Sequence, residues 1–258
     1  MKNQFEDGLL EVCREFRSHC ESVNQLVHFD DDILGFAVNV LRELEASEEG
    51  AGKRMKLKNA MSAVVNAKEN KSLKGRYEVI LNQCLVLLVS YFGSALSDMY
   101  RLSVSEFLFD PGSEYLKSKE IKVSVEEIFS YEVGIGADLG SILIDKAQIS
   151  FQDMQSVSRT FKDYFGVDIA KDSTVNDIIA IHIARHAIVH NAAKLDNKRM
   201  KTLTGAVPRN LFLNAMDGVA FKVTEEVVAA SIKQMEAYLT SLTRKLVAAR
   251  ENPPSRAT

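Results

Sequence analysis

An uncharged run of nineteen residues, from Val79 to Ser97, constrains the fold of this chain more than any other segment. Charged residues bound the run closely, and five polar residues interrupt it: Asn82, Gln83, Ser90, Ser94 and Ser97. The run is nearly long enough to cross a bilayer, but five polar groups would be costly in hydrocarbon. We therefore favour a helix buried on most sides, at the centre of a bundle or at a dimer interface, over a membrane span.

Helix-breaking residues are scarce, since the 258 residues include four prolines and thirteen glycines. This composition favours long helices. Apolar residues recur at helical spacing over roughly 5–23, 32–46, 76–109, 150–165 and 174–191, and a basic helix is expected before 76. The last helix has the clearest pattern, with a capping Thr224 and a sustained four-three apolar spacing from Val228 to Leu246. The chain is expected to be all-α, or nearly so.

Three short segments depart from the helical pattern. Ile121, Val123 and Val125 alternate with other residues, which hints at a short strand within 121–133. Residues 211–213 and 219–223 flank Met216-Asp217-Gly218, a pattern that predicts a small β-hairpin inserted before the last helix. Glycines 134, 136 and 140 have the wrong spacing for a dinucleotide-binding loop and indicate a flexible turn.

Charge is unevenly distributed, although the net value of −3 gives no hint of nucleic-acid binding. Residues 1–50 carry twelve acids against four bases, and residues 53–76 carry eight bases against one acid. The basic stretch is interpreted as a solvated helix face, with a track for a phosphate backbone as the alternative. We divide the chain into an N-terminal helical extension (1–72), a main domain (73–250) and a disordered tail (251–258), with a hinge candidate at 50–52.

The cysteines and the N-terminus suggest a reducing compartment. Cys13 and Cys20 lie about 10 Å apart along a helix, which is too far for a disulfide. Cys84 falls in the apolar run and is expected to pack in the core. The first residues lack the apolar run of a signal peptide. We expect a cytoplasmic protein that does not associate with membranes.

The chemistry-bearing residues gather between Arg185 and Asn191, in the string Arg-His-Ala-Ile-Val-His-Asn. The string ends an apolar helical segment that follows a capping-box pattern at Thr174-x-x-Asp177. Arg185 and His190 are separated by about 7.5 Å of helix rise, so their long side chains could bracket one phosphate.

Three histidines, His182, His186 and His190, recur every four residues and share one face of this helix. His182 is interpreted as a core or interface histidine rather than a site residue. A metal stripe is the alternative, but three positions along one straight helix span about 12 Å, too far for a single ion. No metal and no cofactor are therefore expected.

The string Arg-His-x-x-x-His followed by Asn resembles the R-x4-6-H motif of the HEPN superfamily, over roughly residues 73–250. The resemblance implies a helical bundle of HEPN type that forms a homodimer and cleaves RNA without a metal ion, as toxins and antiviral effectors of prokaryotes do. One departure is Ala192-Ala193, where a glycine often follows in such proteins.

The resemblance also suggests roles for individual residues. His190 is the candidate base, Arg185 holds the phosphate, and His186 either protonates the leaving oxygen or orients Arg185. The residues expected to bind substrate are Asn191, Lys194, Lys198 and Arg199. The expected partners are RNA, such as tRNA, a second copy of the chain, and an antitoxin or regulatory protein. The rival interpretation is a helical module that binds RNA, nucleotide or protein without catalysis.

Overall fold

Every regular element in the described part of the chain is a helix, as expected for an all-α protein. The computed structural model describes residues 2–48, 50–69, 74–108, 114–117, 119–122, 124, 126, 135–169, 171–196, 201, 218 and 220–252. The helices are α1 (Lys2–Ser47), α2 (Ala51–Glu69), α3 (Lys74–Leu108), α4 (Glu114–Lys117), α6 (Ile135–Lys146), α7 (Met154–Phe165), α8 (Ser173–His190) and α10 (Glu225–Glu251).

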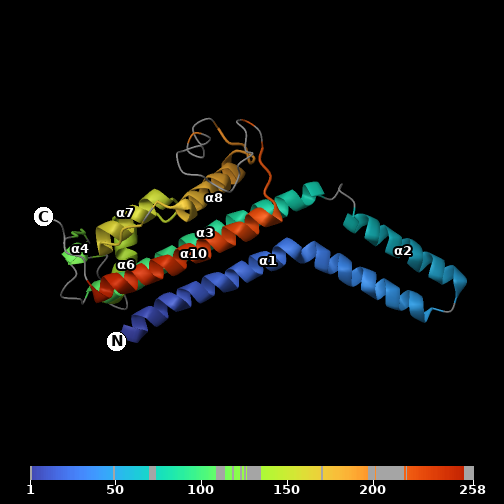
Figure 1. Cartoon of the computed structure of the whole chain (residues 1–258), viewed down its shortest axis with the longest axis horizontal. Helices are drawn as coiled ribbons and strands as arrows, with labels where there is room; N and C mark the ends of the chain where they lie inside the picture. The colour runs from blue at the N-terminus through green and yellow to red at the C-terminus, as the bar shows by residue number, and fades with distance from the viewer. Residues whose placement is uncertain are drawn as a thin grey trace.

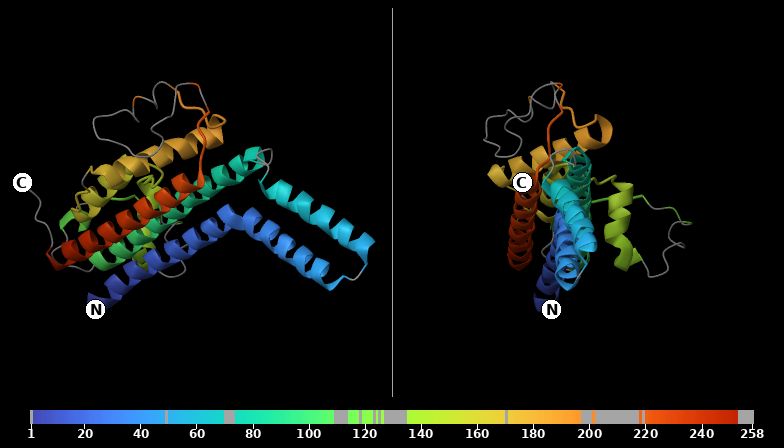
Figure 2. Two further views of the ribbon diagram at one scale, coloured as in Figure 1. Left: turned by 45° about the vertical axis from the view of Figure 1, so that its right-hand side comes forward. Right: turned by 90° about the vertical axis from the view of Figure 1, so that its right-hand side faces the viewer.

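Helix α3 is the central element of the bundle. It packs against α1, α6, α8 and α10, and Figure 2 shows α6 and α10 on opposite sides of it. Its fully buried side chains include Leu85, Leu88, Phe92, Leu96 and Met99. Among the described residues, the segment 78–108 of α3 also meets the length and hydropathy expected of a membrane span. The prediction of a helix at the centre of a bundle is confirmed. The preference for a buried helix over a membrane span stays a prediction, since 39% of its most apolar stretch is buried.

Helix α1 is one helix of 46 residues, so the prediction of separate helices over 5–23 and 32–46 is wrong. The run Asp30-Asp31-Asp32 resembles a cap, but an aspartate inside a helix costs only up to about 0.7 kcal/mol relative to alanine. No proline interrupts residues 2–47, so the backbone hydrogen bonds continue through the acidic run. The helix bends midway instead of ending (Figure 1).

The two halves of α1 have different surroundings. The first half buries Phe5, Leu9, Phe16 and Val23 in the same core as α3 and α10. The second half extends away from the bundle with α2 beside it (Figure 1). We call residues 28–47 together with α2 the arm. Lys53 and Lys58 of α2 pair with Glu48 and Glu45, each at 3.6 Å. The division of the chain at residue 72 stays a prediction.

Helix α6 corrects the prediction of a flexible turn, because Gly136 and Gly140 lie inside it. A Cβ atom placed on Gly140 would lie 2.8 Å from Cα of Arg101 on α3. Glycine is therefore present here because two helix backbones approach closely, which sequence spacing does not reveal. The strand predicted within 121–133 is also wrong for its described residues 121, 122, 124 and 126, which are not in a strand. Val123, Val125 and 127–134 lie outside the described residues.

Replacing Gly140 with alanine is expected to lower the free energy of unfolding by about 1–3 kcal/mol, because the added methyl overpacks the α3–α6 contact. Gly52 is the matched control, since it lies in α2 with no atom within 4 Å of an added Cβ. Gly52→Ala is expected to be neutral or stabilising by up to about 1 kcal/mol. Urea unfolding measures the free energy of unfolding of both variants. Equal changes in the two would show that an added methyl at 140 does not clash with α3.

The helix ends follow local signals with one exception. Gly166 ends α7, predicted over 150–165, with a left-handed φ of 68°, and Thr224 caps α10 as predicted. Helix α8 is capped by Asp172, whose side chain accepts from the backbone N–H of Val175. The capping-box prediction at Thr174 is therefore wrong by two positions. The predicted hairpin strand 211–213 and its turn residues 216–217 lie outside the described residues. In the second predicted strand, residue 220 forms an isolated bridge with 194 and residues 221–223 are not in a strand.

Candidate functional site

Helix α8 presents one buried face and one exposed end. Ile178, Ile181 and Ala184 pack in the core, whereas His186, Val189 and His190 are exposed. The segment is helical because its apolar residues face both α3 and α10 along most of its length. Polar residues follow where that packing ends. The fold therefore holds the Arg185–Asn191 string at the surface on a rigid element.

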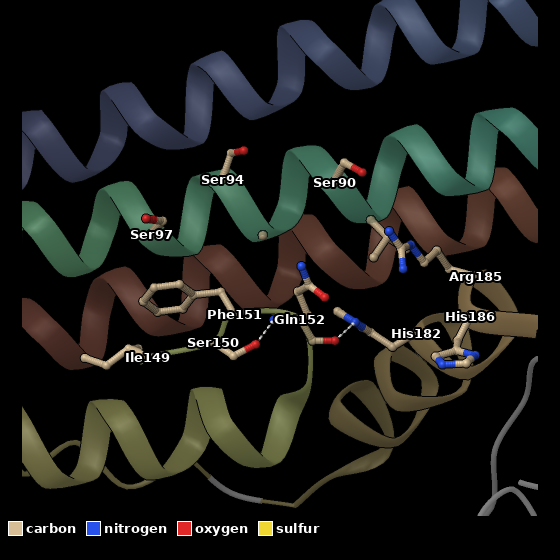
Figure 3. Close-up of a pocket in the computed structure, with 12 residues that line it drawn as sticks. Ser90, Ser94, Ser97, Ile149, Ser150, Phe151, Gln152, His182, Arg185 and His186 are labelled. Carbon is tan, nitrogen blue, oxygen red and sulfur yellow. Dashed lines mark hydrogen bonds between the residues drawn. The ribbon is translucent and has the colours of Figure 1, made fainter. Parts of the chain in front are cut away.

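A cavity of about 460 Å³ lies between α3, α8 and the loop that leads into α7. Arg185 and His186 line it from α8, as Figure 3 shows. The other lining residues are Val89, Ser90, Gly93, Ser94 and Ser97 of α3, Ile149, Ser150, Phe151 and Gln152 of the loop, and His182. The serines were noted only as interruptions of an apolar run. Their spacing of four and three residues is the signal that could have placed them on one face.

His182 is buried beside this cavity, and its surroundings favour the neutral form of the ring. Its Nδ1–H donates to the backbone oxygen of Gln152 at 2.6 Å (Figure 3). Nε2 is buried without a hydrogen-bond partner among the described residues. Burial lowers the pKa of His182 below its ordinary value, and the charge of Arg185 adds to that effect, while Gln152 and Asp153 oppose it. The prediction of a buried histidine is confirmed.

The depressed pKa of His182 makes the stability of the fold depend on pH. Above the ordinary histidine pKa of about 6.5, the ring is neutral in both folded and unfolded chains. As the pH falls below that value, the unfolded chain takes up a proton that the folded chain refuses, so stability decreases until the folded pKa is reached. His182→Gln is expected to reduce the decline in the free energy of unfolding, measured by urea titration, between pH 7 and pH 5. An unchanged dependence of that free energy on pH would show that His182 does not cause the decline.

Arg185, His186 and His190 lie together at the exposed end of α8. The rings of His186 and His190 are 4.6 Å apart between centroids, with an angle of 52° between their planes. Arg185 is half-buried at the cavity wall, and His190 is exposed beyond His186. The three side chains can therefore meet one extended ligand that reaches from the cavity to solvent.

Asn191 shapes the loop after α8. Its backbone N–H donates to the oxygen of Ala187 at 2.8 Å, and its Nδ2 donates to the oxygen of Lys194 at 2.7 Å. Lys194 is exposed next to this turn. Asn191 therefore has a structural role here, and the substrate-binding roles of Asn191 and Lys194 stay predictions. Lys198 and Arg199 lie outside the described residues.

Ala192 and Ala193 have φ values of 47° and 59°, in the left-handed region where glycine is favoured. The departure from a glycine noted in the sequence therefore stores strain in this loop. Replacing the exposed Ala192 with glycine is expected to stabilise the fold by up to about 1 kcal/mol, because relief of strain exceeds the added unfolded-state entropy. Thermal unfolding measures the change. A lower melting temperature in Ala192→Gly would contradict the strained loop.

Comparison with protein families, with curated proteins and with solved structures found no match. Within the described part of the chain, no three histidine, cysteine or acidic side chains lie close enough to hold a metal ion. The chemistry of Arg185, His186 and His190 is therefore the basis on which a function is proposed.

Proposed function

We propose that this protein is a metal-independent endoribonuclease of HEPN type. The observation that carries the proposal is the placement of Arg185, His186 and His190 at the exposed end of α8, where two of them border a cavity lined by both polar and apolar residues. A guanidinium and two imidazoles are the groups that phosphodiester transfer needs when no metal ion supplies positive charge.

His190 acts as the base and removes the proton from a ribose 2′-hydroxyl. The 2′-oxygen then attacks the adjacent phosphorus, and the bond from phosphorus to the 5′-oxygen breaks. His186 in its protonated form gives a proton to the leaving 5′-oxygen. The products are a 2′,3′-cyclic phosphate and a 5′-hydroxyl, and water returns both histidines to their starting states.

Arg185 binds two phosphate oxygens and stabilises the negative charge that develops during attack. Its half-buried position favours this role, because charge-assisted hydrogen bonds strengthen where water is partly excluded. DNA lacks the attacking hydroxyl, so the substrate is RNA. The proposed setting is a cytoplasmic toxin or antiviral effector that acts as a homodimer under the control of an antitoxin or regulatory protein.

The cavity favours a second candidate, a module that binds a nucleotide or RNA without cleaving it. A volume of about 460 Å³ lies in the range of small-molecule sites. Its serine hydroxyls, the amide of Gln152 and the guanidinium of Arg185 could hold a phosphorylated ligand. A binding module of this kind requires Arg185 to bind the ligand, but it does not require His190 to act as a base.

Incubation of the purified full-length protein with labelled single-stranded RNA and tRNA in EDTA tests the proposal. The expected result is cleavage that leaves 2′,3′-cyclic phosphate ends, and no cleavage of DNA of the same sequence. Cleavage that requires added divalent ions would overturn the mechanism. A folded protein that binds RNA and cuts none of it would favour the binding module.

A further inference from the structure

The arm carries several large exposed apolar side chains, and Phe36 among them is the most exposed in the described part of the chain. Phe29, Ile33 and Phe36 are 58%, 52% and 70% exposed. Leu26 and Leu44 of α1 and Met55 of α2 are exposed as well. Soluble proteins seldom leave apolar side chains of this size contiguous on their surface without a binding role.

The exposed residues of α1 form one straight stripe. Leu26, Phe29, Ile33, Phe36 and Leu44, with the half-exposed Val40 between the last two, follow steps of three and four residues. At about 100° per residue they fall within an arc of about 80° and extend over about 27 Å of helix. This spacing is that of a helix–helix seam, and we call these six residues the stripe.

The stripe faces away from the contact between α1 and α2. Val38, which is buried, points about 160° from the centre of the stripe. Among the described side chains of α1 beyond Val27, Val38 alone is buried, and none is buried over residues 51–66 of α2. Two helices that share so small a core gain little of their stability from each other. A partner that covers the stripe would supply the missing core.

We propose that the stripe pairs with the stripe of a second copy of this chain, in antiparallel orientation. A two-fold axis near Gly35 places Leu26 opposite Leu44, Phe29 opposite Val40, and Ile33 opposite Phe36 of the other copy. The stripe is thus complementary to itself, which a two-fold interface requires.

The charges of the arm favour the same partner. Residues 28–47 carry five acids and one base, whereas α2 carries five bases and one acid. Two arms paired in this way form a four-helix bundle in which the acidic α1 of one copy lies beside the basic α2 of the other. The surface is separate from the candidate nuclease site, because no residue that lines the cavity belongs to the stripe.

Sedimentation equilibrium of the full-length protein tests the pairing. The wild-type chain is expected to be a dimer at micromolar concentration, and Phe29→Asp with Phe36→Asp is expected to weaken association by about 100-fold or more. Leu10→Asp is the matched control, since this exposed leucine lies on the packed half of α1, outside the stripe. It is expected to leave the dimer intact.

Circular dichroism and the milder Phe36→Ser variant separate loss of pairing from loss of folding. Phe36 contributes little to the core of its own chain, so Phe36→Ser is expected to keep its helices and still weaken the dimer. A wild-type chain that stays monomeric at micromolar concentration overturns the proposal, whatever else binds the stripe. A dimer with unchanged affinity in both stripe variants overturns it as well.

Discussion

His190→Ala is expected to lower the rate of RNA cleavage by about 100- to 10,000-fold, the usual contribution of one general acid or base. His190 is exposed and in contact with the ring of His186 in the described structure, so its removal leaves the core intact. RNA affinity is expected to change little, because Arg185 and the cavity remain. Cleavage rates and RNA binding of the same preparation measure the two effects separately.

The controls for this prediction come from the same chain. Arg185→Ala is expected to reduce both cleavage and RNA binding, and Arg185→Lys to restore binding more than cleavage, because lysine lacks the two-pronged guanidinium. His28→Ala, on α1 and away from the cavity, is expected to change neither. Full cleavage by His190→Ala would remove His190 from the mechanism. A loss of binding alone in every site variant would support the non-catalytic module.

Phe92→Ala is expected to lower the free energy of unfolding by about 3–5 kcal/mol, the cost of deleting a large side chain from a tight core. Phe92 is fully buried on α3. Its ring lies edge-on to three others, with centroids 6.0 Å from Phe16, 5.6 Å from Tyr238 and 6.2 Å from His182. These partners belong to α1, α10 and α8, so the cavity left by the substitution would weaken three helix contacts at once.

Leu87→Ala is the matched control for Phe92→Ala, since Leu87 lies on the same helix but is 37% exposed. Its effect on urea unfolding is expected to be well below that of Phe92→Ala, because an exposed side chain contributes little to the core. If Phe92→Ala lowers the free energy of unfolding by less than about 1 kcal/mol, helices α1, α3, α8 and α10 do not share one core at this position.

The parts of the fold that sequence predicted correctly are those that local chemistry decides. The periodic apolar residues of α10, the cap at Thr224 and the end of the helix predicted over 150–165 all matched the structure, since each depends on residues within a few positions. The same holds for α3, whose uncharged run indicated a place at the centre of a bundle before any partner was known. The Arg185–Asn191 string could be placed near the end of its helix for the same reason.

Contacts between distant segments decided the rest. Gly140 was predicted to lie in a flexible turn, but it lies inside α6 with the backbone of Arg101 against it. The cavity beside Arg185 is formed by serines on α3 and a loop before α7, which are far apart in sequence. His182 could be assigned to the interior from its pattern, but the carbonyl of Gln152 that sets its tautomer could not.

The sequence by itself therefore determined the strongly periodic helices α3, α7, α8 and α10 and the chemistry available at the end of α8, because periodicity and residue type act over single turns of a helix. Only the tertiary structure decided which residues border Arg185, which face of α1 remains uncovered, and why a glycine is required at 140. These properties depend on how helices that are distant in sequence pack together, because the residues that contact a side chain in the folded protein decide its role.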